Sequence, residues 1–242
     1  MRALPENSEA VDPAASPLAR VAGVFGSPAL TFASIARRPG WVLPLAIPTL
    51  LSIAATAAIL PRIDFDTAVR ERLAARGVTM PEEKVEQIID AQKRFSGLGY
   101  VWALLANTVI ALILATVFWV SFKAFGWDLA FRQSLGVTSH ALLPYIGTSM
   151  LVILFVTRLD LVNPADLGDL TKSNPGFLVD RRANPVLHSL ASSLDVFTLW
   201  VLALLVIGFS IAAKVPRKRA AAVIVGVWGL YVLGKAGVAA LF

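Results

Sequence analysis

Long uncharged stretches separated by short charged segments dominate the hydrophobic pattern of this chain. The clearest example is near the carboxyl end, where residues 196–213 carry no charge and residues 220–242 carry only Lys235. The connecting segment, 214–219, holds four cations in six residues. Apolar runs of this length are typical of transmembrane helices. The pattern therefore predicts two membrane spans joined by a basic turn.

The same criterion predicts three earlier spans and hence an all-α fold, a polytopic bundle of transmembrane helices. The five predicted spans are 41–60, 98–122, 134–157, 191–213 and 220–242. The polar segments between them, 61–97 and 158–190, are predicted to form helical excursions on the outer face. Residues 1–20 lack the apolar core of a signal peptide and are rich in Pro, Ala, Ser and Glu. We expect a disordered cytoplasmic tail there, followed by one membrane domain over 21–242.

Local signals predict where several shorter helices begin and end. Ser27-Pro28 is a typical helix start, and Arg37-Arg38 followed by Pro39-Gly40 a typical end. A helix this short cannot span, so it is either an interfacial helix or a helix packed on the bundle. Thr79 and Glu82 read as a capping box.

Three Asn-Pro pairs punctuate the second outer segment, at 163–164, 174–175 and 184–185. Asparagine followed by proline favours a turn or a helix start. The first pair is expected to open a short helix over 165–170. The last is expected to open one long helix that becomes the fourth span.

Charge indicates which way up the bundle sits. Only 16% of the residues are charged, against about 25% in soluble domains, and the net charge is +6. The cations concentrate in the short loops 123–133 and 214–219 and at Arg37-Arg38. Because short basic loops stay inside, we predict a cytoplasmic N-terminus and an extracytoplasmic C-terminus. This bias explains the positive charge better than a nucleic-acid surface does. The chain has no cysteine, which excludes disulfides and thiolate sites.

Polar residues and prolines inside the predicted spans are the candidate functional residues. Pro44 and Pro48 are expected to bend or open the first span, as a packing kink or as part of a transport site. Asn107 is expected to bond to a neighbouring helix rather than bind a ligand. His140, close before Pro144, is interpreted as a neutral interfacial histidine in preference to a proton relay.

The last two spans carry two further features. If their turn centres near Pro216, Asp195 and Lys235 differ in depth by only ~3 Å. They form an ion pair, or Lys235 extends alone to the outer headgroups. Small residues recur on the face of the last span opposite Lys235, and they predict close packing, either within the chain or between copies of it. That face comprises Ala222, Gly226, Gly229, Leu233, Gly237 and Ala240.

Several segments in order resemble the prokaryotic branch of the Yip family, the Rab-interacting-type integral membrane proteins. They are Phe25-Gly26-Ser27-Pro28 with Phe32, Arg38-Pro39 ahead of Trp41 and Pro44-Leu45, His140 to Pro144, and Ser193 to Trp200. The five predicted spans and the cytoplasmic N-terminus add to the resemblance, which implies a location in a prokaryotic cytoplasmic (inner) membrane. Eukaryotic members are tied to vesicle traffic and small GTPases. The acidic-tyrosine motif of those members is absent here, so the resemblance does not extend to a GTPase partner.

No catalytic constellation accompanies these features. The chain lacks a nucleotide-phosphate loop, HExxH and GxSxG, and its only histidines, His140 and His188, are expected near opposite faces. We predict a non-enzymatic protein without cofactor or metal that organises membrane or binds partner proteins. The lipid bilayer, other membrane proteins or a second copy are the expected partners, and nucleic acid is not. The alternative is a transporter or channel with a polar cavity lined by Asn107 and His140.

Overall fold

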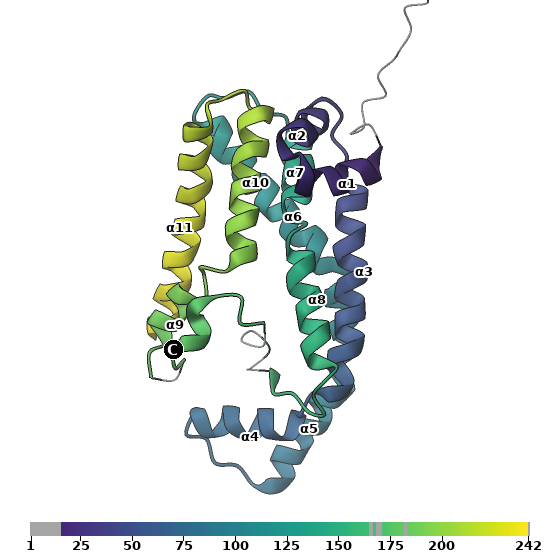
Figure 1. The fold of residues 1–242 in the computed structure, drawn as a ribbon. Coiled ribbons are helices and arrows are strands. Elements are labelled where there is room, and N and C mark those ends of the chain that lie inside the picture. Colours follow the sequence, from purple (N-terminus) through teal and green to yellow (C-terminus); the bar gives the residue numbers. More distant parts are fainter. Residues whose placement is uncertain (1–15, 165–166, 168–170, 182, 242) are drawn as a thin grey trace, which may run out of the picture.

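The computed structural model describes residues 16–164, 167, 171–181 and 183–241. Long helices run side by side and form an elongated bundle (Figure 1). Cationic residues at the helix ends gather at one end of the bundle, which we term the basic end. It comprises Arg37, Arg38, Lys123, Arg132, Lys214, Arg217, Lys218 and Arg219. The opposite end, with the longer connections, is termed the loop end.

The predicted polytopic helical bundle is confirmed. Within the described residues, four segments are long and apolar enough to cross a membrane, and a bent helix pair makes a fifth. The unbroken ones contain α3 (Val42–Ile59), α6 (Leu98–Ala124) and α11 (Arg217–Leu241). α3 packs against α6, and α10 (Val196–Ala212) packs against α11. Helix α3 stays continuous through Pro48, so the proline does not open it.

The third span is interrupted where proline enters it. α7 (Phe131–Ala141) ends before Pro144, and α8 (Tyr145–Val156) begins directly after it. Proline has no N–H to donate to the carbonyl four residues earlier, which ends the regular ladder. Turns bridge the gap, with the Leu143 N–H donating to the His140 carbonyl at 3.2 Å. The two helices together remain long enough for one span.

The fourth span was predicted as one long helix that begins at Asn184-Pro185, but the structure shows two helices. α9 (Pro185–Ala191) covers only seven residues, and α10 begins afresh at Val196. The two axes differ by 51°. The reason is Asp195, whose carboxylate caps a new helix N-terminus by accepting hydrogen bonds from the Phe197 and Thr198 N–H groups at 2.9 and 3.2 Å. The pair at Asn174 opens a 3-10 turn, η3 (Pro175–Leu178), and the helix expected over 165–170 lies outside the described residues.

The main core lies at the basic end, where α2 (Pro28–Arg37) packs against α7 and α10. Phe32 and Ile35 of α2 are fully buried there, together with Phe122 and Phe209. Gly208 permits this approach, because a Cβ at that position would lie 2.5 Å from Val137 Cγ1 and 2.9 Å from Phe32 Cδ1. The inner face of this short helix packs on the bundle, and whether its outer face lies at the membrane interface stays a prediction. Ser27 precedes it as predicted, but its side chain forms no capping bond.

A helix that the sequence pattern did not predict precedes α2. α1 (Pro17–Gly26) begins inside the segment 1–20 that was assigned to a disordered tail, whose first fifteen residues lie outside the described part. The Ser16 hydroxyl accepts a hydrogen bond from the Ala19 N–H at 3.1 Å and caps the helix. Ser16-Pro17 repeats the Ser27-Pro28 start signal, which explains why the helix begins here.

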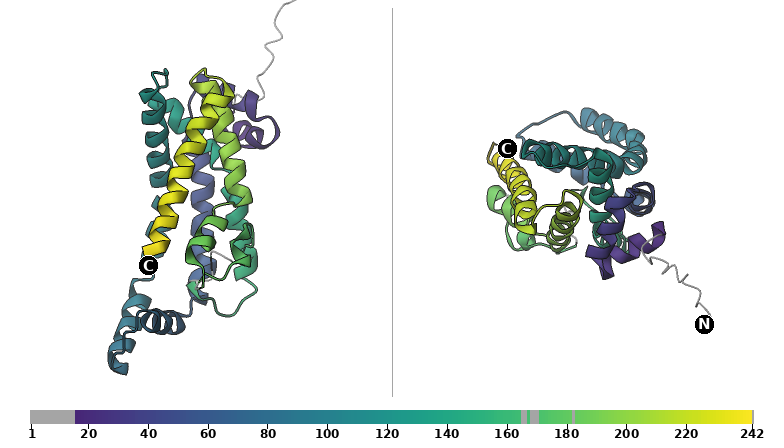
Figure 2. Two further views of the ribbon diagram at one scale, coloured as in Figure 1. Left: turned by 90° about the vertical axis from the view of Figure 1, so that its left-hand side faces the viewer. Right: turned by 90° about the horizontal axis from the view of Figure 1, so that it is seen from above.

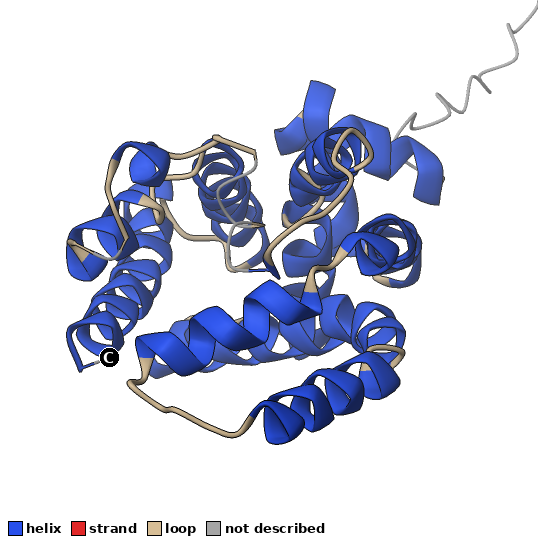
Figure 3. Cartoon of the chain, turned by 90° about the horizontal axis from the view of Figure 1, so that it is seen from below, coloured by secondary structure: helices blue, strands red, loops and turns tan. Residues whose placement is uncertain are grey.

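The loop end carries a hairpin of α4 (Phe65–Ala75) and α5 (Glu82–Phe95), packed through Val69, Val85 and Ile89. It lies beyond the ends of the spans (Figures 1 and 3). The capping box predicted at Thr79 is wrong, because α5 begins after Pro81 without a side-chain cap. Glu82 instead accepts a hydrogen bond from Arg70 Nη1 at 3.2 Å. That bond holds the pKa of Glu82 below its ordinary value.

Candidate functional site

A cluster of polar side chains fills the bend between α9 and α10 near the loop end. Its centre is Asp195, where one carboxylate oxygen caps α10 and the other accepts a hydrogen bond from the Ser173 hydroxyl. The Ser173 hydroxyl also lies 3.0 Å from that of Thr171. The carboxylate is thus stabilised by backbone N–H groups and a hydroxyl.

Lys235 reaches the same bend from α11 but contacts different groups. Its ammonium lies 3.0 Å from the hydroxyl oxygens of both Ser192 and Ser193. These hydroxyls donate in turn to the Ser189 carbonyl at 3.1 and 2.8 Å. Lys235 therefore fastens α11 to the end of α9.

Asp195 and Lys235 do not form the ion pair that was one of the two predicted alternatives. Asp195 and Lys235 both lie near the bend between α9 and α10, but each charged group contacts neutral partners instead of the other. Asp195 uses the new helix N-terminus, and Lys235 uses two serine hydroxyls. Lys235 also does not extend alone to the headgroups, because its hydrogen bonds are within the protein.

His140 is buried inside the bundle. It is 2% exposed, and its Nδ1 donates to the Gly136 carbonyl of the same helix at 2.8 Å. α1 and α2 pack against α7, and the depth of His140 in the membrane stays a prediction. Beside it in sequence, the buried Thr138 hydroxyl has no hydrogen-bond partner. Pro144 lies at the break just after it.

Asn107 forms the contact predicted for it. Its amide nitrogen donates to the Ser52 hydroxyl of α3 at 3.0 Å and joins α6 to α3. Pro44 and Pro48 are buried in α3. Both helices are thus connected by one hydrogen bond among apolar contacts, as expected of a polar residue inside a membrane bundle.

The small-residue face of α11 points away from the protein. A Cβ built on Gly226, Gly229 or Gly237 would meet nothing within 4 Å. The inner side of the helix instead carries Lys235 and the buried Ala236, against α9. The glycine face therefore does not serve packing within the chain. It lies on the outer surface of the bundle, where α11 runs along its side (Figure 2).

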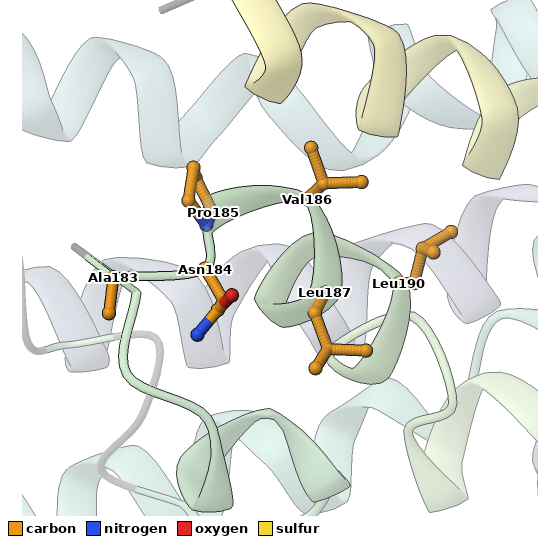
Figure 4. Close-up of a pocket in the computed structure, with 6 residues that line it drawn as sticks. All are labelled: Ala183, Asn184, Pro185, Val186, Leu187 and Leu190. Carbon is orange, nitrogen blue, oxygen red and sulfur yellow. The ribbon is translucent and has the colours of Figure 1, made fainter.

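A shallow pocket of about 350 Å³ opens at α9, at the loop end (Figure 4). Asn184 is the one polar side chain among its six lining residues. None of the candidate residues predicted from the sequence lines it. Its walls are Ala183, Asn184, Pro185, Val186, Leu187 and Leu190. In the described ranges, histidines and carboxylates also form no group of three that could hold a metal ion.

Several structural residues escaped the sequence reasoning. Ser192, Ser193 and Ser173 complete the cluster at the bend, and the serine pair just before Asp195 was a usable signal. Gly208 was another, since it is the one glycine in a span of large apolar residues. Tyr145 and Thr198 join α8 to α10 through hydroxyl groups 3.0 Å apart.

The long apolar helices and the polar groups shared between them define a multi-pass membrane protein. A comparison with family models matches the Yip1 domain over residues 22–238. The chain therefore belongs to the Yip1 domain family, as the order of its four sequence motifs suggested. No curated protein and no solved structure matches it.

Proposed function

We propose that this protein works without catalysing a reaction, by binding other membrane proteins or a second copy of itself through its outer helix faces. The observation that carries the proposal is where its polar groups point. The side chains of Asn107, Lys235 and Asp195 all contact other parts of the chain. They hold helices together, and among the residues that the structure describes these three do not converge on a common substrate site.

The glycine face of α11 supports the choice of surface. Gly226, Gly229 and Gly237 meet no other part of the chain, so a second helix can approach the α11 backbone closely. In lipid, helix association depends on such close van der Waals contact, because apolar burial gives no advantage there. A transmembrane helix is therefore the partner that fits this surface.

The proposed setting is the cytoplasmic membrane of a prokaryote, with the basic end inside. The support is the positive-inside rule applied to the short basic connections and to Arg37 and Arg38. On this orientation α4, α5 and α9 lie outside, and the chain ends outside.

Photo-crosslinking in native membranes tests the proposal. A photoreactive residue at Gly229 is expected to crosslink to another membrane protein or to a second copy. A bulky substitution, Gly226→Leu, should abolish that product. The matched control is Val238, which is 57% exposed on the other side of α11. Equal crosslinking from both positions, or none from Gly229, would contradict the proposal.

A flux assay separates binding from transport. Liposomes with the purified protein are expected to leak ions and small solutes no faster than empty liposomes. A protein-dependent flux that Asn107→Ala or His140→Ala alters would favour a transporter instead.

A further inference from the structure

The segment 17–36 exposes large apolar side chains on its outer side, while Val24, Phe32 and Ile35 fill its inner side. Its only formal charge is Arg20, and Arg20 is turned inward, at 8% exposure. The buried polar side chains Thr31 and Ser34 also face the bundle. Leu18 and Leu30, by contrast, are 69% and 72% exposed. Large apolar side chains on the outer side, with the one charge turned inward, are expected where the surroundings are lipid.

The contacts of the hairpin show how deep it lies. Phe32 of α2 packs at Gly208, four residues before the end of α10 at the basic end, or about 6 Å along the helix. Phe25, at the other end of the hairpin, packs edge-on against Trp200, with ring centroids 5.5 Å apart. Trp200 lies twelve residues before that end of α10, or about 18 Å. The turn between α1 and α2 thus lies more than halfway along the uncharged stretch of α10.

The open end of the hairpin lies at the basic end of the bundle. Arg37 and Arg38 end α2 at the basic end, and the Arg20 guanidinium donates to the Arg38 carbonyl at 2.8 Å. The chain therefore enters and leaves on the same side. In Figure 1, α1 and α2 lie beside α7 and α10 near this end. In the view from above they lie on the opposite side of the bundle from α11 (Figure 2).

The backbone N–H and carbonyl of Ser27, in the turn itself, both have partners within the hairpin. The Ser27 N–H donates to the Gly23 carbonyl at 2.8 Å, and the Ser27 carbonyl accepts from both the N–H and the hydroxyl of Thr31. Pro28 brings no N–H that would need a partner. The two helices touch at Gly23, where a Cβ would lie 2.4 Å from Thr31 Oγ1. Non-helical backbone at membrane depth needs such internal partners.

We propose that α1 and α2 form a re-entrant hairpin that dips into the membrane leaflet at the basic end, with Leu18, Phe25 and Leu30 in contact with lipid acyl chains. The partner is lipid rather than a soluble protein, because the turn lies below the level of the cations. It is lipid rather than a fixed protein surface because the exposed face continues that of the spans. Trp41 and Leu199 beside it are 40% and 48% exposed. The inference goes beyond the binding function proposed for α11.

Fluorescence quenching in liposomes tests this inference. The chain has no cysteine, so Phe25→Cys, Leu30→Cys and the exposed control Lys218→Cys each give one site for an environment-sensitive dye. At positions 25 and 30 we expect quenching by lipids spin-labelled in the acyl chain. Quenching by aqueous iodide should be about tenfold weaker there than at 218, because hydrocarbon excludes ions. Position 30 has no ring contact to lose, so it remains informative if Phe25→Cys fails to fold.

Two results would overturn the inference. Iodide quenching at 25 and 30 equal to that at 218 would place the hairpin in water, available to a soluble partner. Protection from both quenchers would show that protein covers the hairpin, and concentration-dependent crosslinking of Leu30→Cys would then identify a second copy.

Discussion

Substituting Gly208 tests how α2 is held in the bundle. A methyl group at Gly208 would lie 2.5 Å from Val137 Cγ1 and 2.9 and 3.1 Å from two ring carbons of Phe32. Both side chains are fully buried, so neither can move aside without disturbing the core. Overpacking of this kind costs about 1–3 kcal/mol. Alanine recovers up to about 1 kcal/mol as a better helix former than glycine. We expect Gly208→Ala to lower the free energy of unfolding by about 1–2 kcal/mol.

The assay is unfolding of the purified protein in mixed detergent micelles, followed by near-ultraviolet circular dichroism. Gly226→Ala is the matched control, since a Cβ there meets nothing within 4 Å. The control should be as stable as the parent protein or slightly more so. Val137→Ala should partly rescue Gly208→Ala, because it removes the nearest methyl group, so the double variant should be more stable than the sum of the single changes. A Gly208→Ala protein as stable as Gly226→Ala would refute the packing described for α2, α7 and α10.

Three further predictions concern polar contacts. Lys235→Met should destabilise the junction of α9 and α11 by about 0.6–1.7 kcal/mol, the range for hydrogen bonds between membrane helices; the same unfolding assay checks it, and an unchanged midpoint would show that the two serine contacts contribute nothing. Asn107→Ala and Ser52→Ala should each cost about 0.6 kcal/mol, and the double variant no more than either alone; additive losses would mean that the two side chains do not interact. Because Arg70 lowers the pKa of Glu82 in the folded hairpin, the stability from this contact is complete above the ordinary carboxyl pKa and is lost as pH falls through the lowered value. Distances between spin labels on α4 and α5 should therefore broaden in acid in the parent protein, whereas Glu82→Gln should show no such pH dependence.

The spans could be predicted from the sequence because length and apolarity are local properties. Each predicted span is helical, although the third and fourth are broken into two helices each, and the basic connections came together at one end. Asn107 was also predictable, since a lone amide in a span needs a partner on a neighbouring helix. What the pattern could not give was the identity of that partner, Ser52, which depends on which helices meet.

The bend at the fourth span shows why the charged residues were harder. Counting residues from the turn predicted similar depths for Asp195 and Lys235. It could not show that Asp195 begins a new helix, because a carboxylate in a membrane is satisfied equally by backbone N–H groups or by a cation. The Asp195 carboxylate accepts hydrogen bonds from the N–H groups at the start of α10, and the Lys235 ammonium donates to the hydroxyls of two serines.

Helix α2 was predicted from its start and stop signals, but α1 was missed for a different reason. Residues 1–20 are rich in Pro, Ala, Ser and Glu and lack an apolar core, so the start of α1 was included in a predicted tail. Only the three-dimensional arrangement shows that Arg20 turns inward and that the apolar side chains turn outward. The role of single glycines was likewise ambiguous in the sequence. Gly208 lies against Val137 and Phe32, whereas a Cβ at Gly226 would meet nothing within 4 Å, and the sequence does not distinguish the two.

The orientation of the bundle is the claim on which the account depends most, and single-cysteine labelling tests it directly. Lys218→Cys lies in the basic turn, and Val78→Cys lies in the α4–α5 connection, where Val78 is 38% exposed. In intact cells, a maleimide that cannot cross the membrane should label Val78→Cys, and it should label Lys218→Cys only after permeabilisation. Labelling of Lys218→Cys in intact cells, with Val78→Cys protected, would contradict the account.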